Sequence, residues 1–159
     1  MNLLNLVMIG FIATAAADLW QQAVKRLAGF PIPNWELIGR WVALLPRGTV
    51  IHTSIAAAPA VEGEGAIGWI FHYAVGIAYA ACFVAILGLV PGSASGLAVA
   101  LAFAGVTLAA PWFFLQPALG LGLMGRRAPN QKELLFVTIT THFVFGLGLY
   151  AGLNAVVPR

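Results

Sequence analysis

Charged residues are scarce in this chain of 159 residues. Asp, Glu, Lys and Arg make up 8% of it, whereas a soluble domain carries about 25%. Hydrophobic residues make up 61%, against roughly 45–50% in soluble proteins, and the mean hydropathy is +0.93. This balance excludes a soluble enzyme, a disordered tail and a nucleic-acid binder. It indicates an integral membrane protein whose length suits a single domain.

Other familiar signals are missing as well. The single cysteine, Cys82, excludes a disulfide within the chain. No phosphate-binding loop of the G-x-x-x-x-G-K type and no nucleophile elbow is present. We therefore assign no residue a catalytic role, and the sequence indicates no reaction.

Long apolar runs are what the chain does contain. A helix needs about 20 residues to cross the hydrocarbon core. The sequence predicts an all-α bundle of four transmembrane helices over residues 3–24, 66–90, 95–115 and 134–157, with a tight turn at 91–93. The first run has no Lys or Arg before it, so we expect a retained helix rather than a signal peptide. Small residues spaced by four, such as Gly148 and Gly152, favour close helix packing, a homo-oligomer, or both.

Basic residues predict the orientation of the bundle. Seven of the eight lie in the two longer connections, and the eighth is Arg159. The seven are Lys25, Arg26, Arg40, Arg47, Arg126, Arg127 and Lys132. The positive-inside rule then places both connections in the cytoplasm and both termini outside. We expect the Arg126–Arg127 pair to contact lipid headgroups.

The first connection contains an amphipathic segment at 34–45. Ile38, Trp41 and Leu45 share one helical face, and Asn34 is a predicted N-cap. Glu36 and Arg40 are spaced to pair along the helix. We expect a helix lying in the cytoplasmic interface; a gate over a site is the alternative.

Three ionisable residues fall within the predicted spans: Asp18, His72 and His142. Burying Asp at the centre of a span costs roughly 2.5–3.5 kcal/mol on insertion scales, so such residues point to function. The topology places all three in the cytoplasmic half, with His72 about 9 Å and His142 about 12 Å from that surface. The outer half contains almost nothing ionisable.

These residues predict a ligand site. His72 and His142 could be axial ligands of a haem, or bind a transition metal with Asp18, His52 or a glutamate completing the shell. Thr138, four residues before His142, is predicted to orient that ring. The structural alternatives are interhelical hydrogen bonds for the histidines and pairing with Lys25 or Arg26 for Asp18.

Further polar candidates lie at the same end of the bundle. Gln116 closes the third span, and Glu62 and Glu64 flank Gly63 before the second. We expect the two glutamates to cap the second helix, where negative charge is favourable. Gating a cation path is the alternative.

Short fragments spread along the chain resemble a known family. They are Ala13-Thr14 with Asp18-Leu19-Trp20, Gly39-Arg40-Trp41, His52, Gly68-Trp69 with His72-Tyr73, Gln116-Pro117 with Gly120 and Gly122, and His142 with Gly146-Leu147-Gly148-Leu149-Tyr150. Together they are similar to an uncharacterised family of small four-helix proteins of the bacterial inner membrane, a domain of unknown function. The resemblance implies four helices in that membrane and supplies no activity or cofactor. Arg126 and Arg127 depart from it, since the family has small and hydroxylated residues in that loop.

Three functional hypotheses follow. The first is a membrane protein that binds a transition metal, a haem or a small polar ligand at the His/Asp cluster. The second is an accessory structural subunit of a larger membrane complex of respiratory or photosynthetic type, packed through its small-residue faces. The third is a small proton-coupled transporter acting as a homo-oligomer, with Asp18 and a histidine as the relay.

Overall fold

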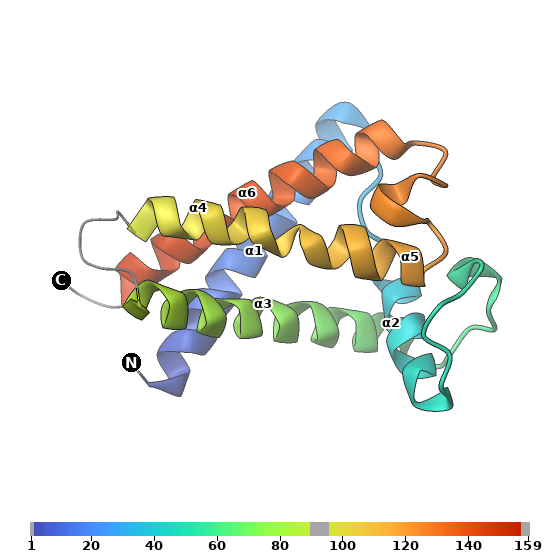
Figure 1. Ribbon diagram of the computed structural model, residues 1–159, viewed down its shortest axis with the longest axis horizontal. Coiled ribbons are helices and arrows are strands. Elements are labelled where there is room, and N and C mark those ends of the chain that lie inside the picture. Colours follow the sequence, from blue (N-terminus) through green and yellow to red (C-terminus); the bar gives the residue numbers. More distant parts are fainter. Residues whose placement is uncertain (1, 90–95, 157–159) are drawn as a thin grey trace.

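The computed structural model describes residues 2–89 and 96–156, and every regular element in that part of the chain is helical (Figure 1). The main elements are α1 (Leu3–Ala28), α2 (Trp35–Leu44), α3 (Glu64–Leu89), α4 (Gly96–Thr107), η3 (Ala110–Leu115), α5 (Gln116–Ala118) and α6 (Gln131–Val156). Three short 3₁₀ turns complete them: η1 (Leu45–Arg47), η2 (Ile55–Ala57) and η4 (Leu123–Gly125). The predicted all-α architecture is confirmed.

Four helical stretches of the described chain are long and apolar enough to cross a membrane. They are Leu3–Ala28, Glu64–Leu89, Gly96–Ala118 and Gln131–Val156. The four predicted spans are therefore confirmed, and the chain is a multi-pass membrane protein. The ends predicted at residues 90, 95 and 157, the turn at 91–93 and Arg159 lie outside the described residues.

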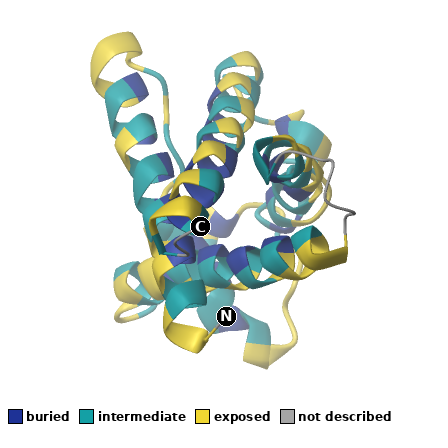
Figure 2. Cartoon of the chain, turned by 90° about the vertical axis from the view of Figure 1, so that its left-hand side faces the viewer, coloured by how far each residue is buried: buried dark blue, intermediate teal, exposed yellow. Residues whose placement is uncertain are grey.

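The spans cross as a bundle, with the chain ends at one side and α2, α5 and their loops at the other (Figure 1). α1 packs against both α3 and α6, and α6 also packs against α4. Buried residues follow the inward faces of the helices, while large side chains such as Leu19, Ile70 and Val106 are exposed (Figure 2). An apolar exterior of this kind suits contact with lipid.

Small residues bring the spans together within one chain. A Cβ added to Gly148 of α6 would lie 2.6 Å from the Cα of Ala13 in α1. A Cβ added to Gly10 would lie 2.6 Å from the Cα of Ile77 in α3. Close approach of this kind maximises dispersion contacts between helices in lipid. Gly10 and Gly148 thus serve the internal packing, and the homo-oligomer stays a prediction.

The third span is not the continuous helix that the sequence predicts over 95–115. Pro111 has no backbone N–H, and Ala110–Leu115 winds as a π-helix. The N–H of Gln116 then donates to the carbonyl of Pro111, five residues back. The wider turn rotates the residues that follow it away from the positions that a regular α-helix would give them. Gln116, directly after this turn, is buried at 5% exposure.

The predicted helix of the first connection forms as α2. Asn34 caps it, because its Oδ1 accepts the N–H groups of Glu36 and Leu37 at 2.9 and 3.2 Å. Ile38 and Trp41 are buried on its inner face. That α2 lies in the membrane interface stays a prediction.

Candidate functional site

Two glycines allow α2 to cross α3 at close range. A Cβ on Gly39 would lie 1.7 Å from the carbonyl oxygen of Glu64, and one on Gly68 would lie 1.8 Å from that of Trp35. The two backbones therefore touch directly at this point. The crossing fixes where the first residues of α2 sit relative to His72, one turn further along α3.

An ion pair joins α2 and α3 at the same crossing. Arg40 donates from Nε and Nη2 to the two carboxylate oxygens of Glu64, at 2.8 and 2.7 Å, and from Nη1 to the carbonyl of Ala58 at 2.9 Å. These hydrogen bonds to Glu64 raise the pKa of Arg40. The predicted pairing of Arg40 with Glu36 is wrong, because the bidentate geometry across the helices satisfies more donors than a pair along one helix.

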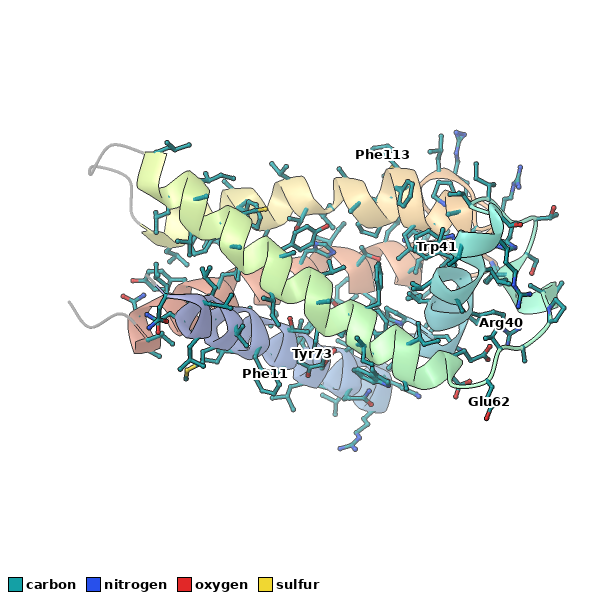
Figure 3. All side chains as sticks on the ribbon, turned by 90° about the horizontal axis from the view of Figure 1, so that it is seen from below. Phe11, Arg40, Trp41, Glu62, Tyr73 and Phe113 are labelled. Carbon is teal, nitrogen blue, oxygen red and sulfur yellow. The ribbon has the colours of Figure 1, made fainter. Side chains whose placement is uncertain are left out.

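The two glutamates before the second span have different roles. Glu64 Oε2 accepts the N–H of Val61 at 2.8 Å, so it does satisfy a backbone donor near the start of α3. Glu62 is exposed and projects outward from the loop (Figure 3). Only Glu64 is therefore part of the packed structure, and neither lines the cavity described below.

Asp18 and His72 form a hydrogen-bonded pair between α1 and α3. His72 Nε2 lies 2.8 Å from Asp18 Oδ1, and the hydroxyl of Tyr73 donates to Oδ2 at 3.0 Å. The ring of Trp35 stacks on His72 with centroids 3.8 Å apart. Asp18 is thus held by α3 rather than by Lys25 or Arg26. Trp35 and Tyr73 were missed by the sequence analysis, although Tyr73 directly follows His72.

His142 has a different partner from the predicted one. Its Nδ1 lies 2.9 Å from Thr107 Oγ1 of α4, whereas the hydroxyl of Thr138 donates to the carbonyl of Leu134 at 2.7 Å. The hydroxyl of a threonine in a helix readily donates to a carbonyl of the preceding turn. Thr138 makes this bond, so its hydroxyl does not orient the ring of His142. The partner is on a neighbouring helix, so no spacing within the sequence could identify it.

The predicted metal shell does not form. Among the residues that the structure describes, no group of three or more His, Cys, Asp or Glu side chains is placed to hold a metal ion. His52 lies apart from the pair of Asp18 and His72: its backbone N–H donates to the carbonyl of Ala118 at 2.9 Å, and its Nε2 is buried without a partner. Metal binding is therefore not supported by the arrangement of donors.

His72 and His142 do face a common space. A cavity of about 450 Å³ lies among α1, α2, α3, the π-helical segment and α6, and both rings line it. Gln116 and Thr138 line it too, but Asp18 and His52 do not. Aromatic side chains make up much of the wall: Trp35, Trp41, Phe71, Tyr79, Phe114 and Phe145. Residues of all four helical spans and of α2 line the cavity, as in ligand sites within helix bundles.

Two of the residues that line this cavity have a buried polar atom without a hydrogen-bond partner in the protein. The atoms are Gln116 Oε1 and Thr141 Oγ1, on side chains of residues 5% and 8% exposed. A buried polar atom left unpaired costs about 1–3 kcal/mol. Gln116 was among the sequence candidates. Thr141 was missed, although it lies directly before His142 and one turn after Thr138.

The comparisons with known proteins add one match. Residues 7–157 match a protein family described as "Protein of unknown function (DUF2938)". No curated protein and no solved structure matches the chain. The match covers all four spans and the cavity, and it supplies no ligand.

Proposed function

Since the chain belongs to this family of unknown function, we propose from the cavity itself that it is a ligand-binding membrane protein. The ligand is a small organic molecule, largely apolar, that carries hydrogen-bonding groups. It lies among the spans in the half of the bundle that contains α2. The basic connections at that end favour the cytoplasmic side of a bacterial inner membrane, with the termini in the periplasm.

One observation carries this proposal. Gln116 and Thr141 belong to different spans and both line the cavity, and each has a buried oxygen, Oε1 and Oγ1, without a partner in the protein. Native proteins pair nearly all their buried polar groups, so exceptions call for a specific cause. Two exceptions on the same cavity are accounted for together by a ligand that bonds to both.

The donor geometry favours an organic ligand over the other predicted groups. A metal ion needs several donors around it, and no three His, Cys, Asp or Glu side chains of the described residues lie together. The ring of His72 is bonded through Nε2 to Asp18 at 2.8 Å. Trp35 covers one face of the same ring. His72 is therefore suited to form part of the wall, with Asp18 and Tyr73 holding its orientation.

A proton-coupled transporter is a second candidate, and it rests on the Asp18–His72 pair. Two titratable groups at 2.8 Å, one of which lines the cavity, are the parts that a proton relay requires. The accessory-subunit hypothesis stays a prediction, since Ala74 and Ala78 leave one exposed small-residue face on α3.

Two threonines one turn apart provide the test. Both Thr138 and Thr141 line the cavity, but only the hydroxyl of Thr141 lacks a partner. Phenol is a suitable probe, since it is small, apolar and carries one hydroxyl. Binding is measured by equilibrium dialysis of the purified protein in mild detergent against micelles without protein.

We expect phenol to bind above the micelle blank and Thr141→Val to weaken that binding about fivefold to tenfold, the usual effect of one lost hydrogen bond. Thr138→Val should change it less than twofold. Equal losses in both variants would mean that the unpartnered hydroxyl has no special role. Binding no higher than the blank would overturn the proposal.

A further inference from the structure

A groove on the outside of the bundle combines apolar walls with two charged residues. It has a volume of about 560 Å³ and lies between the last turns of α1 and the first turns of α6, away from the chain ends (Figure 1). Val24 and Leu27 of α1 and Phe136 of α6 line it, with Lys132 and Glu133. Leu27 is 88% exposed and Phe136 46% exposed, so this α1–α6 groove opens to the surroundings of the bundle.

The length of the groove is close to that of one acyl chain in a bilayer. Along α1 its lining runs from Trp20 to Ala28, about 12 Å at 1.5 Å per residue. One leaflet contributes half of a hydrocarbon core of about 30 Å, so an acyl chain there reaches about 15 Å. The Nε1–H of Trp20 donates to Thr140 Oγ1 at 2.9 Å, and this donor is therefore satisfied within the protein. The part of the groove around Trp20 thus suits hydrocarbon.

The two charged residues of the lining lie at the other end of the groove. Lys132 and Glu133 are in the first turn of α6, and neither forms an ion pair with another side chain of the described residues. Lys25 and Arg26 lie in the last turn of α1 but are not on the lining, which follows positions 20, 23, 24, 27 and 28 along one face of that helix. The groove itself therefore carries one cation and one anion.

We propose that the α1–α6 groove binds a phospholipid of the phosphatidylethanolamine class. One acyl chain lies along Val24, Leu27 and Phe136, the phosphate faces Lys132, and the ammonium group faces Glu133. Each contact is a hydrogen bond between two charged groups, which is stronger than a bond between neutral ones. An anionic headgroup without an amine would place a like charge beside Glu133. A choline headgroup has no N–H to donate to that carboxylate.

This site is separate from the cavity of the proposed function. No residue of the described chain lines both the groove and the cavity. Lipid binding in the groove and phenol binding in the cavity are therefore tested independently, and either result leaves the other standing.

The test is native mass spectrometry of the purified protein, freed of lipid, in mild detergent. The probes are dioleoyl phosphatidylethanolamine, dioleoyl phosphatidylglycerol and dioleoyl phosphatidylcholine. They share their acyl chains and differ only in headgroup, so their order of affinity reports on the charged end of the groove. We expect the ethanolamine lipid to bind at least about threefold more tightly than either of the others, as one exposed charge pair allows.

Charge variants identify the residues that make this selection. Glu133→Gln should bring the ethanolamine and choline lipids within about twofold of each other, and Lys132→Gln should weaken the ethanolamine lipid about threefold. Lys25→Gln removes a cation at the same end of the bundle but outside the lining, so it should change that affinity by less than about 1.5-fold.

Packing variants locate the acyl chain. Ala23 lines the groove, so Ala23→Phe fills it and should weaken all three lipids about fourfold or more, the effect of one methylene left without its contacts. Ala102→Phe, on the exposed face of α4, is the matched control and should leave the three affinities unchanged.

Three outcomes would overturn the proposal. Tighter binding of phosphatidylglycerol than of the ethanolamine lipid would show that the basic residues at this end select an anionic lipid. Equal binding of all three lipids would show that the headgroup is not recognised. Equal losses in Ala23→Phe and Ala102→Phe would show that lipid covers the exterior without a site in the groove. Circular dichroism shows whether each variant is folded, and Glu133→Gln, a change without added volume, decides the matter if Ala23→Phe is not.

Discussion

The two sides of α2 differ in how completely their polar groups are satisfied. On the side toward α3, Gly39 and Gly68 bring the backbones into contact and Arg40 is bonded to both oxygens of Glu64. On the other side, α2 borders a cavity of about 450 Å³ that Gln116 and Thr141 also line, each with a buried oxygen that has no partner in the protein. α2 therefore packs tightly against α3 on one side and borders the cavity on the other. The comparison teaches that the partly buried ion pair belongs to the architecture, while the neutral residues Gln116 and Thr141 point to binding.

The largest expected effect on stability comes from a substitution where α2 packs against α3. Gly68→Ala places a Cβ at 1.8 Å from the carbonyl of Trp35, so α2 must move away from α3. We expect a loss of stability of about 3 kcal/mol or more, at or above the upper end for overpacked cores. Thermal unfolding in detergent measures it.

Gly65→Ala is the matched control for that substitution. It lies one turn earlier on α3, and its added Cβ would meet only Glu36 Cγ at 3.6 Å, an ordinary contact. We expect a change within about 0.5 kcal/mol. Equal effects in the two variants would show that the α2–α3 contact is not as close as the backbone positions require.

The next effect in size concerns the ion pair. Glu64→Gln removes the charge that Arg40 faces and one of the two acceptors it uses, so we expect a lower unfolding midpoint than in the parent chain, by less than Gly68→Ala causes. Glu62→Gln, on the exposed carboxylate two residues earlier, should leave the midpoint unchanged. A drop of the same size in both variants would indicate a general effect of negative charge at this helix start, not the pair.

The smallest expected effect on stability comes from a residue that lines the cavity, and here the substitution should stabilise the protein. Thr141→Val replaces an unpartnered buried hydroxyl by a methyl group of the same size, so the ligand-free protein should gain about 1 kcal/mol of stability. Thr138→Val loses a bond to Leu134, and should be neutral or slightly destabilising. Unfolding in protein freed of small molecules by dialysis compares the two. A destabilised Thr141→Val would mean that this hydroxyl has a partner within the protein, and the contrast between the two sides would be lost.

The sequence predicted the helices well, but it predicted the hydrogen-bond partners of their polar side chains poorly. Asn34 caps α2 as expected, because capping depends on residues two and three positions along the chain. Asp18, His72 and His142 were correctly singled out as polar residues within spans. Their partners, Tyr73 and Thr107, were not, and Arg40 was assigned to Glu36 instead of Glu64. A hydrogen bond between helices depends on their rotation, which composition and periodicity do not determine.

The sequence by itself determined that this is a four-span membrane protein, because apolar runs of sufficient length have no other stable placement. It also predicted that the ionisable residues of the spans share the cytoplasmic half, and this stays a prediction. Only the tertiary structure decided that Asp18 bonds to His72 while His142 bonds to Thr107, and that Gln116 and Thr141 line a cavity without partners. The physical reason is the close approach of small residues, such as Gly148 on Ala13, together with the wide turn after Pro111. These two features set how each helix is rotated, and rotation decides which polar atoms meet.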